Sequence, residues 1–195
     1  RYMVFPQKES EKLQNIKNKL NIIYLPGHSS RFDELIHLKR GLYKEGINIE
    51  SLNIDYNLPF KDIAEEISKY ISKNYKEKVC LMGLSFGAVM ALKVASLIPK
   101  KINRVFAINP FFERKTVLKT KKNYENINIS DFCDKNIKAH VIYSSKDKRI
   151  KPRNSKKIQS FLSCGISRID GSNHTISDQD SQQIIKKIIL SKWKR

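Results

Sequence analysis

The sequence predicts a single-domain, three-layer α/β/α sandwich around a mainly parallel sheet. Short β-rich apolar runs alternate with longer segments of helical periodicity along most of the chain. This order is typical of βα units whose parallel strands are covered by helices on both faces. A length of 195 residues, of which 40% are hydrophobic, allows one core large enough for a central sheet. We therefore expect residues 1–195 to form one domain.

The first half of the chain predicts three strands, each followed by a helix. The strands are short β-rich runs, of which the second alternates apolar and polar residues: 20–25, 47–54 and 78–82. The helices have apolar residues at helical spacing: about 32–44, 61–75 and 88–98. The first helix ends before Gly46, a suitable C-terminal cap, and Pro99 stops the third. Because the third helix is almost entirely apolar, we expect it to be buried.

The second half predicts three more strands and two helices. The strands are again short apolar runs: 104–108, 139–143 and 166–169. The helices have one apolar side each: 152–162 and 178–193. Residues 111–138, between the fourth and fifth strands, are polar, basic and weakly patterned. This stretch predicts a short lid or an irregular insertion.

Composition narrows the possible functions. The cysteines Cys80, Cys133 and Cys164 have neither disulfide-framework nor zinc-site spacing, so we expect reduced thiols and no metal site. No apolar run approaches the ~20 residues that cross a bilayer, and residues 1–19 lack the apolar core of a secretory signal. We therefore expect no transmembrane segment and a cytoplasmic location.

The sequence Gly83-Leu84-Ser85-Phe86-Gly87 is the strongest functional signal. It stands where the apolar third strand ends and the buried third helix begins. A sharp strand-to-helix turn of this kind exposes a serine hydroxyl above the sheet edge, and small neighbours let the backbone approach closely. A serine hydroxyl needs an adjacent base to become a nucleophile. Ser85 is therefore the candidate nucleophile, and a tight turn with an incidental serine is the alternative interpretation.

The acid and the base are expected after later strands, in the order serine, acid, histidine. Asp147 follows the fifth strand, where a carboxylate can orient an imidazole and stabilise its charged form. His174 follows the last short strand, in a loop of small residues. His37 and His140 fall within a helical and a strand pattern, where packing roles are expected. We therefore predict Asp147 as the acid and His174 as the base.

An oxyanion hole is expected from two backbone amides. One is the N–H of Phe86, the residue after the nucleophile, and the other comes from the loop after the first strand. In that loop the amides of His28 and Ser29 are both candidates. A Pro-Gly turn followed by polar residues is the simpler interpretation of the same loop.

Together these segments resemble the α/β-hydrolase superfamily, with similarity from Leu20 to the terminal helix. Residues 25–30 are similar to its oxyanion loop, 83–87 to its nucleophile elbow, 147–152 to its acid loop and 171–174 to its histidine loop. Length and motif order are similar to those of compact members, such as the small bacterial YqiA-like esterases. The resemblance implies a reduced α/β-hydrolase fold and hydrolysis of an ester, thioester or amide through an acyl-enzyme, without metal or organic cofactor.

The sequence also departs from the pattern of that superfamily. Many members carry His-Gly in the oxyanion loop, where this chain has Pro26-Gly27-His28. The antiparallel strands usual at the amino end are not evident, and residues 111–138 are too few for a substantial cap domain. We therefore expect an uncapped serine esterase or thioesterase with an open site that suits a large substrate.

The net charge of +19 is unevenly distributed. Residues 146–157 contain one acidic residue, Asp147, and seven basic ones: Lys146, Lys148, Arg149, Lys151, Arg153, Lys156 and Lys157. Residues 113–122 are also basic. Both segments follow strand carboxyl ends, where ligands of open α/β sheets bind. A solvated lysine-rich face of a chain rich in lysine, asparagine and isoleucine is the alternative interpretation.

Basic charge around the site predicts an anionic substrate, with Lys146, Lys148 and Arg149 as candidate binding residues. Acyl-carrier-protein esters, coenzyme A thioesters and anionic lipids are the candidates, so an acidic carrier protein is a possible partner. An acyltransferase on the same scaffold is an alternative function. A catalytically silent nucleic-acid-binding module is another, but the chain contains no evident recognition motif and the order of Ser85, Asp147 and His174 would be unexplained.

Overall fold

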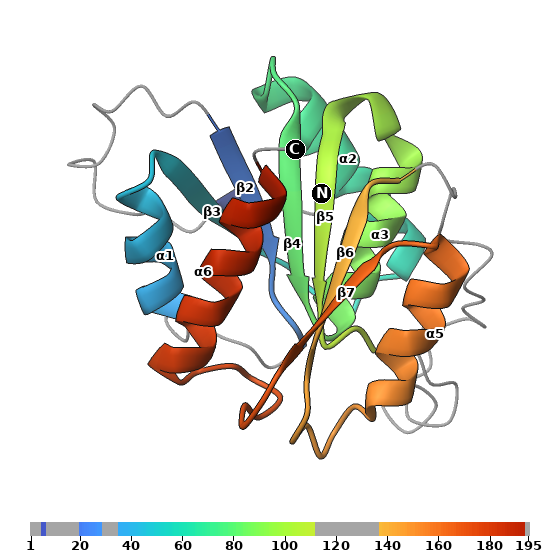
Figure 1. Ribbon diagram of the computed structural model, residues 1–195. Helices are drawn as coiled ribbons and strands as arrows, with labels where there is room; N and C mark the ends of the chain where they lie inside the picture. Colours follow the sequence, from blue (N-terminus) through green and yellow to red (C-terminus); the bar gives the residue numbers. More distant parts are fainter. Residues whose placement is uncertain (1–4, 7–19, 29–34, 112–136, 194–195) are drawn as a thin grey trace.

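A computed structural model describes residues 5–6, 20–28, 35–111 and 137–193 (Figure 1). Most of the insertion expected at 111–138 lies outside the described residues, as do Ser29 and the expected start of the first helix.

The strands of the described residues form one seven-stranded sheet in the order β1-β3-β2-β4-β5-β6-β7. The strand bounds are β1 Phe5–Pro6, β2 Leu20–Leu25, β3 Ile47–Asn53, β4 Val79–Leu84, β5 Ile102–Ile108, β6 Ala139–Ser144 and β7 Gly165–Ile169. The six strands from β2 to β7 pair in parallel throughout. The mainly parallel sheet that the alternating pattern predicts is therefore confirmed.

Strand β1 is an antiparallel strand near the amino end that was not evident in the sequence. It pairs antiparallel with the end of β3, Phe5 opposite Asn53 and Pro6 opposite Leu52. Two residues are too few to give a visible alternation of apolar and polar positions, so periodicity could not indicate this strand.

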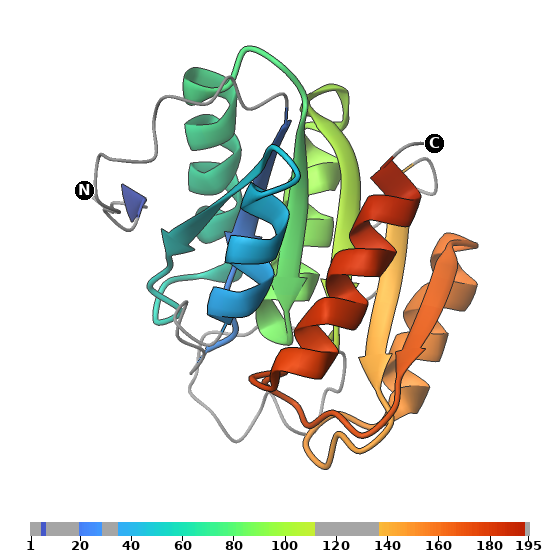
Figure 2. The same cartoon turned by 60° about the vertical axis from the view of Figure 1, so that its left-hand side comes forward.

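Helices cover both faces of the sheet (Figures 1 and 2). The helix bounds are α1 Ile36–Tyr43, α2 Phe60–Asn74, α3 Phe86–Leu97, α5 Pro152–Leu162 and α6 Gln179–Trp193, with a short 3₁₀ turn, η3, at Pro99–Lys101. One apolar cluster joins α2, α3 and α5 to the strands, and a second joins α1 and α6 to the opposite face. The described chain is thus a three-layer α/β/α sandwich, as predicted.

The middle of the sheet explains which segments are most deeply buried. Every residue of the central strand β4 is buried, and so is most of α3, which packs against β4 and β5. A strand covered on both faces needs apolar side chains on both sides, which is why 79–84 reads as a continuous apolar run rather than an alternating one.

Strand order also fixes where a ligand can bind. From β2 the chain moves outward to β3, and it then returns to the other side of β2 to form β4. The segments after β2 and β4 therefore leave the sheet in opposite directions and open a crevice at their carboxyl ends. The loop at 26–28 and Ser85 both lie at this point.

Candidate active site

Ser85 occupies the single residue between β4 and α3. Its backbone has φ 56° and ψ −116°, a conformation that costs a residue with a side chain about 1–3 kcal/mol. Hydrogen bonds hold this backbone from both sides: its N–H donates to the carbonyl of Ile108 at 2.9 Å, and its carbonyl accepts from the N–H of Phe111 at 3.2 Å and of Ala88 at 3.1 Å. The neighbouring strand β5 therefore maintains the strained turn.

The two glycines of the motif permit close backbone contacts. A β-carbon at Gly83 would lie 2.2 Å from the Gly87 carbonyl oxygen, and one at Gly87 would lie 2.1 Å from the Leu25 carbonyl oxygen. Both neighbours are backbone atoms of well-packed segments and cannot move aside. The glycines thus bring the start of α3 against the end of β4 and against the loop after β2.

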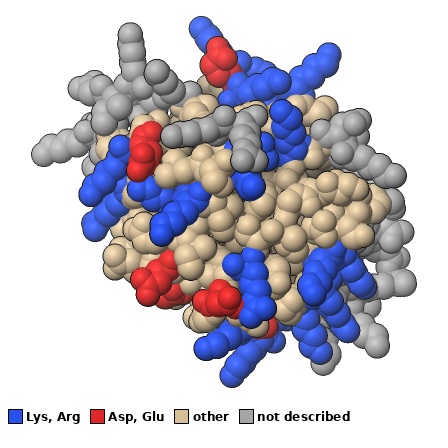
Figure 3. Space-filling view, in the orientation of Figure 1, with Lys and Arg blue, Asp and Glu red and all other residues tan. Residues whose placement is uncertain are grey.

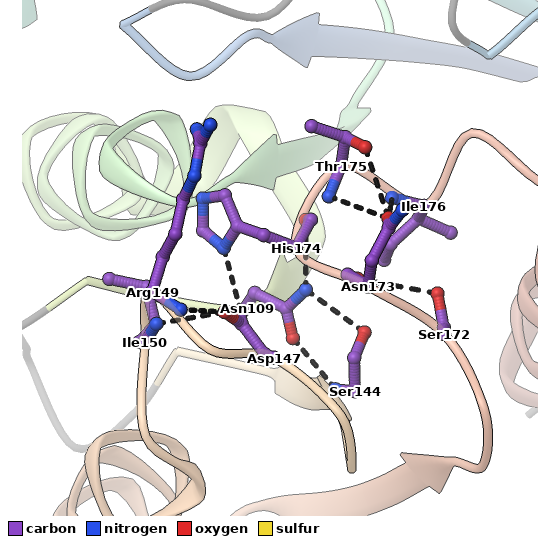
Figure 4. A network of polar contacts seen from close by, with 10 residues as sticks. All are labelled: Asn109, Ser144, Asp147, Arg149, Ile150, Ser172, Asn173, His174, Thr175 and Ile176. Atoms are coloured by element: carbon purple, nitrogen blue, oxygen red, sulfur yellow. Dashed lines mark hydrogen bonds and ion pairs between the residues drawn. The ribbon is translucent and has the colours of Figure 1, made fainter.

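Asp147 and His174 form a hydrogen-bonded pair (Figure 4). The distance from His174 Nδ1 to Asp147 Oδ2 is 2.7 Å, and the side chains are 11% and 1% exposed. The other carboxylate oxygen, Oδ1, accepts the backbone N–H groups of Arg149 and Ile150, each at 2.8 Å. Because a carboxylate only accepts hydrogen bonds, Nδ1 carries the proton of a neutral imidazole, and Nε2 is left as the acceptor.

The loop that carries His174 is held by its own side chains. Asn173 Oδ1 accepts the N–H groups of Thr175 and Ile176, both at 3.1 Å, in a local turn. Ile176 has φ 55°, although a β-branched residue is strongly disfavoured in that region. Gln182 of α6, which is fully buried, donates to the carbonyl of Ile176 at 3.1 Å and anchors the strained residue.

Asn109 is a site residue that the sequence did not indicate. It follows β5 with φ 43° and is 2% exposed. Its Nδ2 donates to the His174 carbonyl at 3.1 Å and to Ser144 Oγ at 3.0 Å, and its Oδ1 accepts the Ser144 N–H at 2.7 Å. The side chain thus ties the base loop to the end of β6 (Figure 4). Its position directly after a predicted strand was the one available signal.

The loop after β2 is anchored by an aromatic cluster. The Tyr56 hydroxyl donates to the Pro26 carbonyl, and its ring stacks on His28 at a centroid distance of 5.8 Å. Tyr56 and Phe60 both meet the ring of Phe86 edge-on, at 5.2 and 5.4 Å. This cluster joins the expected oxyanion loop to the first residue of α3, and sequence reasoning missed Tyr56.

The predicted residues therefore lie at one edge of the sheet, after β4, β6 and β7. The acid and the base are joined directly. Among the described residues no hydrogen bond joins the Ser85 hydroxyl to His174. The two residues are linked indirectly: the Ser85 N–H donates to the Ile108 carbonyl, and the next residue, Asn109, donates to the His174 carbonyl.

The loop around Asp147 is strongly basic on its outer side. Lys146, Lys148 and Arg149 are exposed, whereas Asp147 between them is buried. In Figure 4 the side chain of Arg149 extends from this turn on the side where the His174 ring lies. Three positively charged side chains thus lie within two positions of the candidate acid in the sequence.

Two cysteines, Cys80 and Cys164, are the candidate thiol nucleophiles among the described residues. Burial raises the pKa of the Cys80 thiol to about 12 and also raises that of Cys164, so both are protonated near pH 7. The described residues contain no cluster of His, Cys, Asp or Glu side chains suited to a metal ion. In the same part of the chain, no helix combines the length and apolar character needed to cross a membrane.

A cavity of about 180 Å³ lies between Lys78, Asn103 and Lys138, at the end of the sheet opposite Ser85.

Comparisons with known proteins match the fold but not the sequence. No protein-family model and no curated protein matches the sequence. The α/β hydrolase enzyme MGS-MChE2, from a sediment metagenome of the Mar Chica lagoon in Morocco, is 13% identical, with a TM-score of 0.77 and 90% of each chain covered. Est1E from Butyrivibrio proteoclasticus is 13% identical, with a TM-score of 0.77 over 93% of this chain and 91% of that one. The thioesterase domain from the curacin biosynthetic pathway is 12% identical, with a TM-score of 0.67 over 88% and 91%.

These likenesses extend over most of every chain compared, and they agree with the parallel strand order and with the strained strand-to-helix turn at Ser85. The chain therefore has the α/β-hydrolase fold.

Proposed function

We propose that this protein is a serine hydrolase that cleaves a carboxylic ester or thioester through an acyl-enzyme. The observation that carries the proposal is the 2.7 Å contact between His174 Nδ1 and Asp147 Oδ2 at the sheet edge where Ser85 is held in a strained turn. Solved structures that share this fold include an esterase domain and a thioesterase domain, which also supports the proposal.

In the first half of the reaction, Ser85 Oγ attacks the acyl carbonyl carbon while His174 Nε2 takes the hydroxyl proton. Asp147 keeps the imidazole in the tautomer with Nδ1–H and stabilises the imidazolium. The tetrahedral intermediate then collapses: the bond from carbon to the leaving oxygen or sulfur breaks, and His174 gives its proton to the leaving group. The acyl group remains on Ser85 Oγ as an ester.

In the second half, water replaces the leaving group. His174 Nε2 takes a proton from the water as its oxygen attacks the acyl carbon, and the same proton returns to Ser85 when the carboxylic acid leaves. The negative oxygen formed in both halves is assigned to the N–H of Phe86 and to the amide of His28 or Ser29. The start of α3 favours this charge because the positive end of the helix dipole points there.

Labelling with a fluorophosphonate, which reacts with activated serines, tests the proposal. We expect the wild type to be labelled once, Ser85→Ala to be unlabelled and His174→Ala to lose about 10⁴-fold in labelling rate, because loss of either group removes the activated nucleophile. Ser96→Ala is the matched control, since Ser96 lies in the same helix α3 with its hydroxyl bonded to the Leu92 carbonyl. Labelling that persists in Ser85→Ala would refute the assignment.

A further inference from the structure

The outer surface of α5 and of the loop before it is uniformly basic. We call it the basic face, and it consists of seven exposed residues: Lys146, Lys148, Arg149, Lys151, Arg153, Lys156 and Lys157. Asp147 is the one acidic residue of this segment, and it is buried and bonded to His174. Figure 3 shows lysine and arginine side chains gathered at the lower right, over α5 and that loop.

Within the part of the chain that the structure describes, most of this positive charge has no acidic partner. Among the described residues, no ion pair involves six members of the basic face: Lys146, Lys148, Arg149, Lys151, Lys156 and Lys157. Lysines elsewhere do have acidic partners, such as Lys69 with Glu66 at 3.2 Å and Lys186 with Glu45 at 2.9 Å. Residues 146–157 contain seven basic residues and one carboxylate, Asp147, which is buried, so positive charge is concentrated in this segment.

The basic face begins at the candidate active site and runs away from it. Lys146 and Lys148 flank Asp147, whereas Arg153, Lys156 and Lys157 lie along one exposed side of α5. The eleven residues of α5 extend over roughly 16 Å at the usual helical rise. A compact anionic group at Ser85 would contact only the near end of this face, whereas an acidic macromolecule can contact its whole length.

One of these charges, that of Lys151, lies at the amino end of α5, where it destabilises the helix. Lys151 is the N-terminal cap residue of α5 and makes no capping hydrogen bond, and no acidic residue occupies the first turn. The amino end of a helix is its positive end, where cations are unfavourable and a capping Asp or Ser is preferred. Selection for stability does not explain this arrangement, which points to binding.

We infer that the basic face docks an acidic protein that carries an acyl group as an ester or thioester and presents it to Ser85. The inference rests on the proposed hydrolase function and names its substrate class. An anionic membrane suits the face poorly, because the large apolar residues that are exposed in the described part of the chain, Ile36, Leu97 and Ile184, lie on α1, α3 and α6 rather than on α5. Duplex nucleic acid matches the charge but offers no acyl ester.

The test compares two thioesters with the same acyl group. One is carried by a purified acidic acyl carrier protein, and the other by the small neutral thiol N-acetylcysteamine. In the variant Lys156→Glu with Lys157→Glu, we expect kcat/KM for the carrier substrate to fall at least about tenfold at low ionic strength, because the attraction becomes repulsion. The kcat/KM for the small thioester is expected to stay unchanged, since neither residue belongs to the proposed catalytic group.

The matched control is Lys78→Glu with Lys138→Glu, which makes the same change in net charge at exposed positions at the opposite end of the sheet. It is expected to leave the rate with the carrier within about twofold, because the distance to the site exceeds the screening length of ~10 Å at 0.1 M salt. An equal loss in both variants would overturn the inference. An unchanged kcat/KM for the carrier substrate in the Lys156→Glu, Lys157→Glu variant would also overturn it. The same holds if that variant loses binding to phosphatidylglycerol vesicles or duplex DNA but keeps its rate with the carrier. A wild type that cleaves neither thioester would instead refute the proposed function.

A second variant separates binding from folding. Lys151→Asp introduces an N-terminal cap on α5 and a favourable charge at its positive end, so we expect Tm to rise by about 2–4 °C. We expect the same variant to lower kcat/KM for the carrier substrate about threefold while the small thioester reacts as before. A rise in Tm with no loss toward the carrier would contradict a docking role for this end of the basic face.

Discussion

At the scale of single residues, Asn109 has the most testable role. Replacing it with glycine keeps the positive φ but removes its bonds to His174 and Ser144. Because a small displacement of a catalytic group is costly, we expect kcat to fall about 10- to 100-fold with a smaller change in KM. Ester hydrolysis, measured well below Tm, checks this.

The variant Asn109→Asp is the comparison for that measurement. It retains an acceptor for the Ser144 N–H but has no donor for the His174 carbonyl. It is therefore expected to lose as much kcat as the glycine variant. Full activity in Asn109→Asp would show that the bond to His174 contributes nothing to catalysis.

The sequence indicates some of these residues and conceals others for a physical reason. Ser85, Asp147 and His174 could be proposed because each has a motif or a chain order that names it. Asn109 and Tyr56 act through partners 65 and 30 positions away, His174 and Pro26. Such pairs form only when strands β5 and β3 take their places in the sheet, and nothing local distinguishes these residues from other polar or aromatic residues after a strand.

At the scale of elements, the contact between α3 and the loop after β2 gives the next prediction. In Gly87→Ala the new β-carbon meets the Leu25 carbonyl at 2.1 Å and the Pro26 carbonyl at 2.5 Å. The loop must move, so we expect a loss of about 1–3 kcal/mol in the free energy of unfolding and a fall in activity of at least about tenfold. Urea unfolding and ester hydrolysis measure the two effects.

Gly41→Ala is the control for that substitution. It lies within α1, where a new β-carbon meets the flexible side chain of Lys186 at 3.1 Å. Because alanine is the better helix former, the free energy of unfolding is expected to rise by up to about 0.5–1 kcal/mol without loss of activity. If Gly87→Ala behaves like Gly41→Ala, the close approach at the turn is not required for the site.

Element boundaries show where periodicity stops being informative. The helix expected at 61–75 is Phe60–Asn74, and the one expected at 152–162 is found at those residues. The third strand continues to Leu84, and the buried helix begins at Phe86 rather than residue 88. Both boundaries that differ from the prediction lie in the Gly-Leu-Ser-Phe-Gly turn. Glycine is neither clearly apolar nor clearly polar, so the hydrophobic pattern does not show where the strand ends and the helix begins.

At the scale of the whole molecule, the layers follow from the sequence but the strand order does not. Alternating strands and helices predict a parallel sheet covered on both faces. The order β3-β2-β4 depends on which side of β2 the returning strand joins, and no local pattern records that choice. The same order brings His28, Ser85 and Asn109 toward one edge, so a chain-order argument could propose the site residues but not their contacts.

Acid sensitivity is a further property of the whole molecule, and it centres on His140. This residue of β6 is 3% exposed, and its Nε2 lies 2.8 Å from Ser167 Oγ. Burial, and then the positive charges of Lys192 and Arg104, lower its pKa from 6.5 to about 4. As pH falls, His140 is protonated near pH 6.5 in the unfolded chain but only near pH 4 in the folded protein. The neutral histidine therefore leaves the folded state fully stable above pH 6.5, and this stability is lost as pH falls from 6.5 to 4. The loss amounts to about 3 kcal/mol. Urea unfolding between pH 7.5 and 4 is expected to show this slope in the wild type and a shallower one in His140→Gln, which cannot titrate; equal slopes in the two proteins would contradict the assignment.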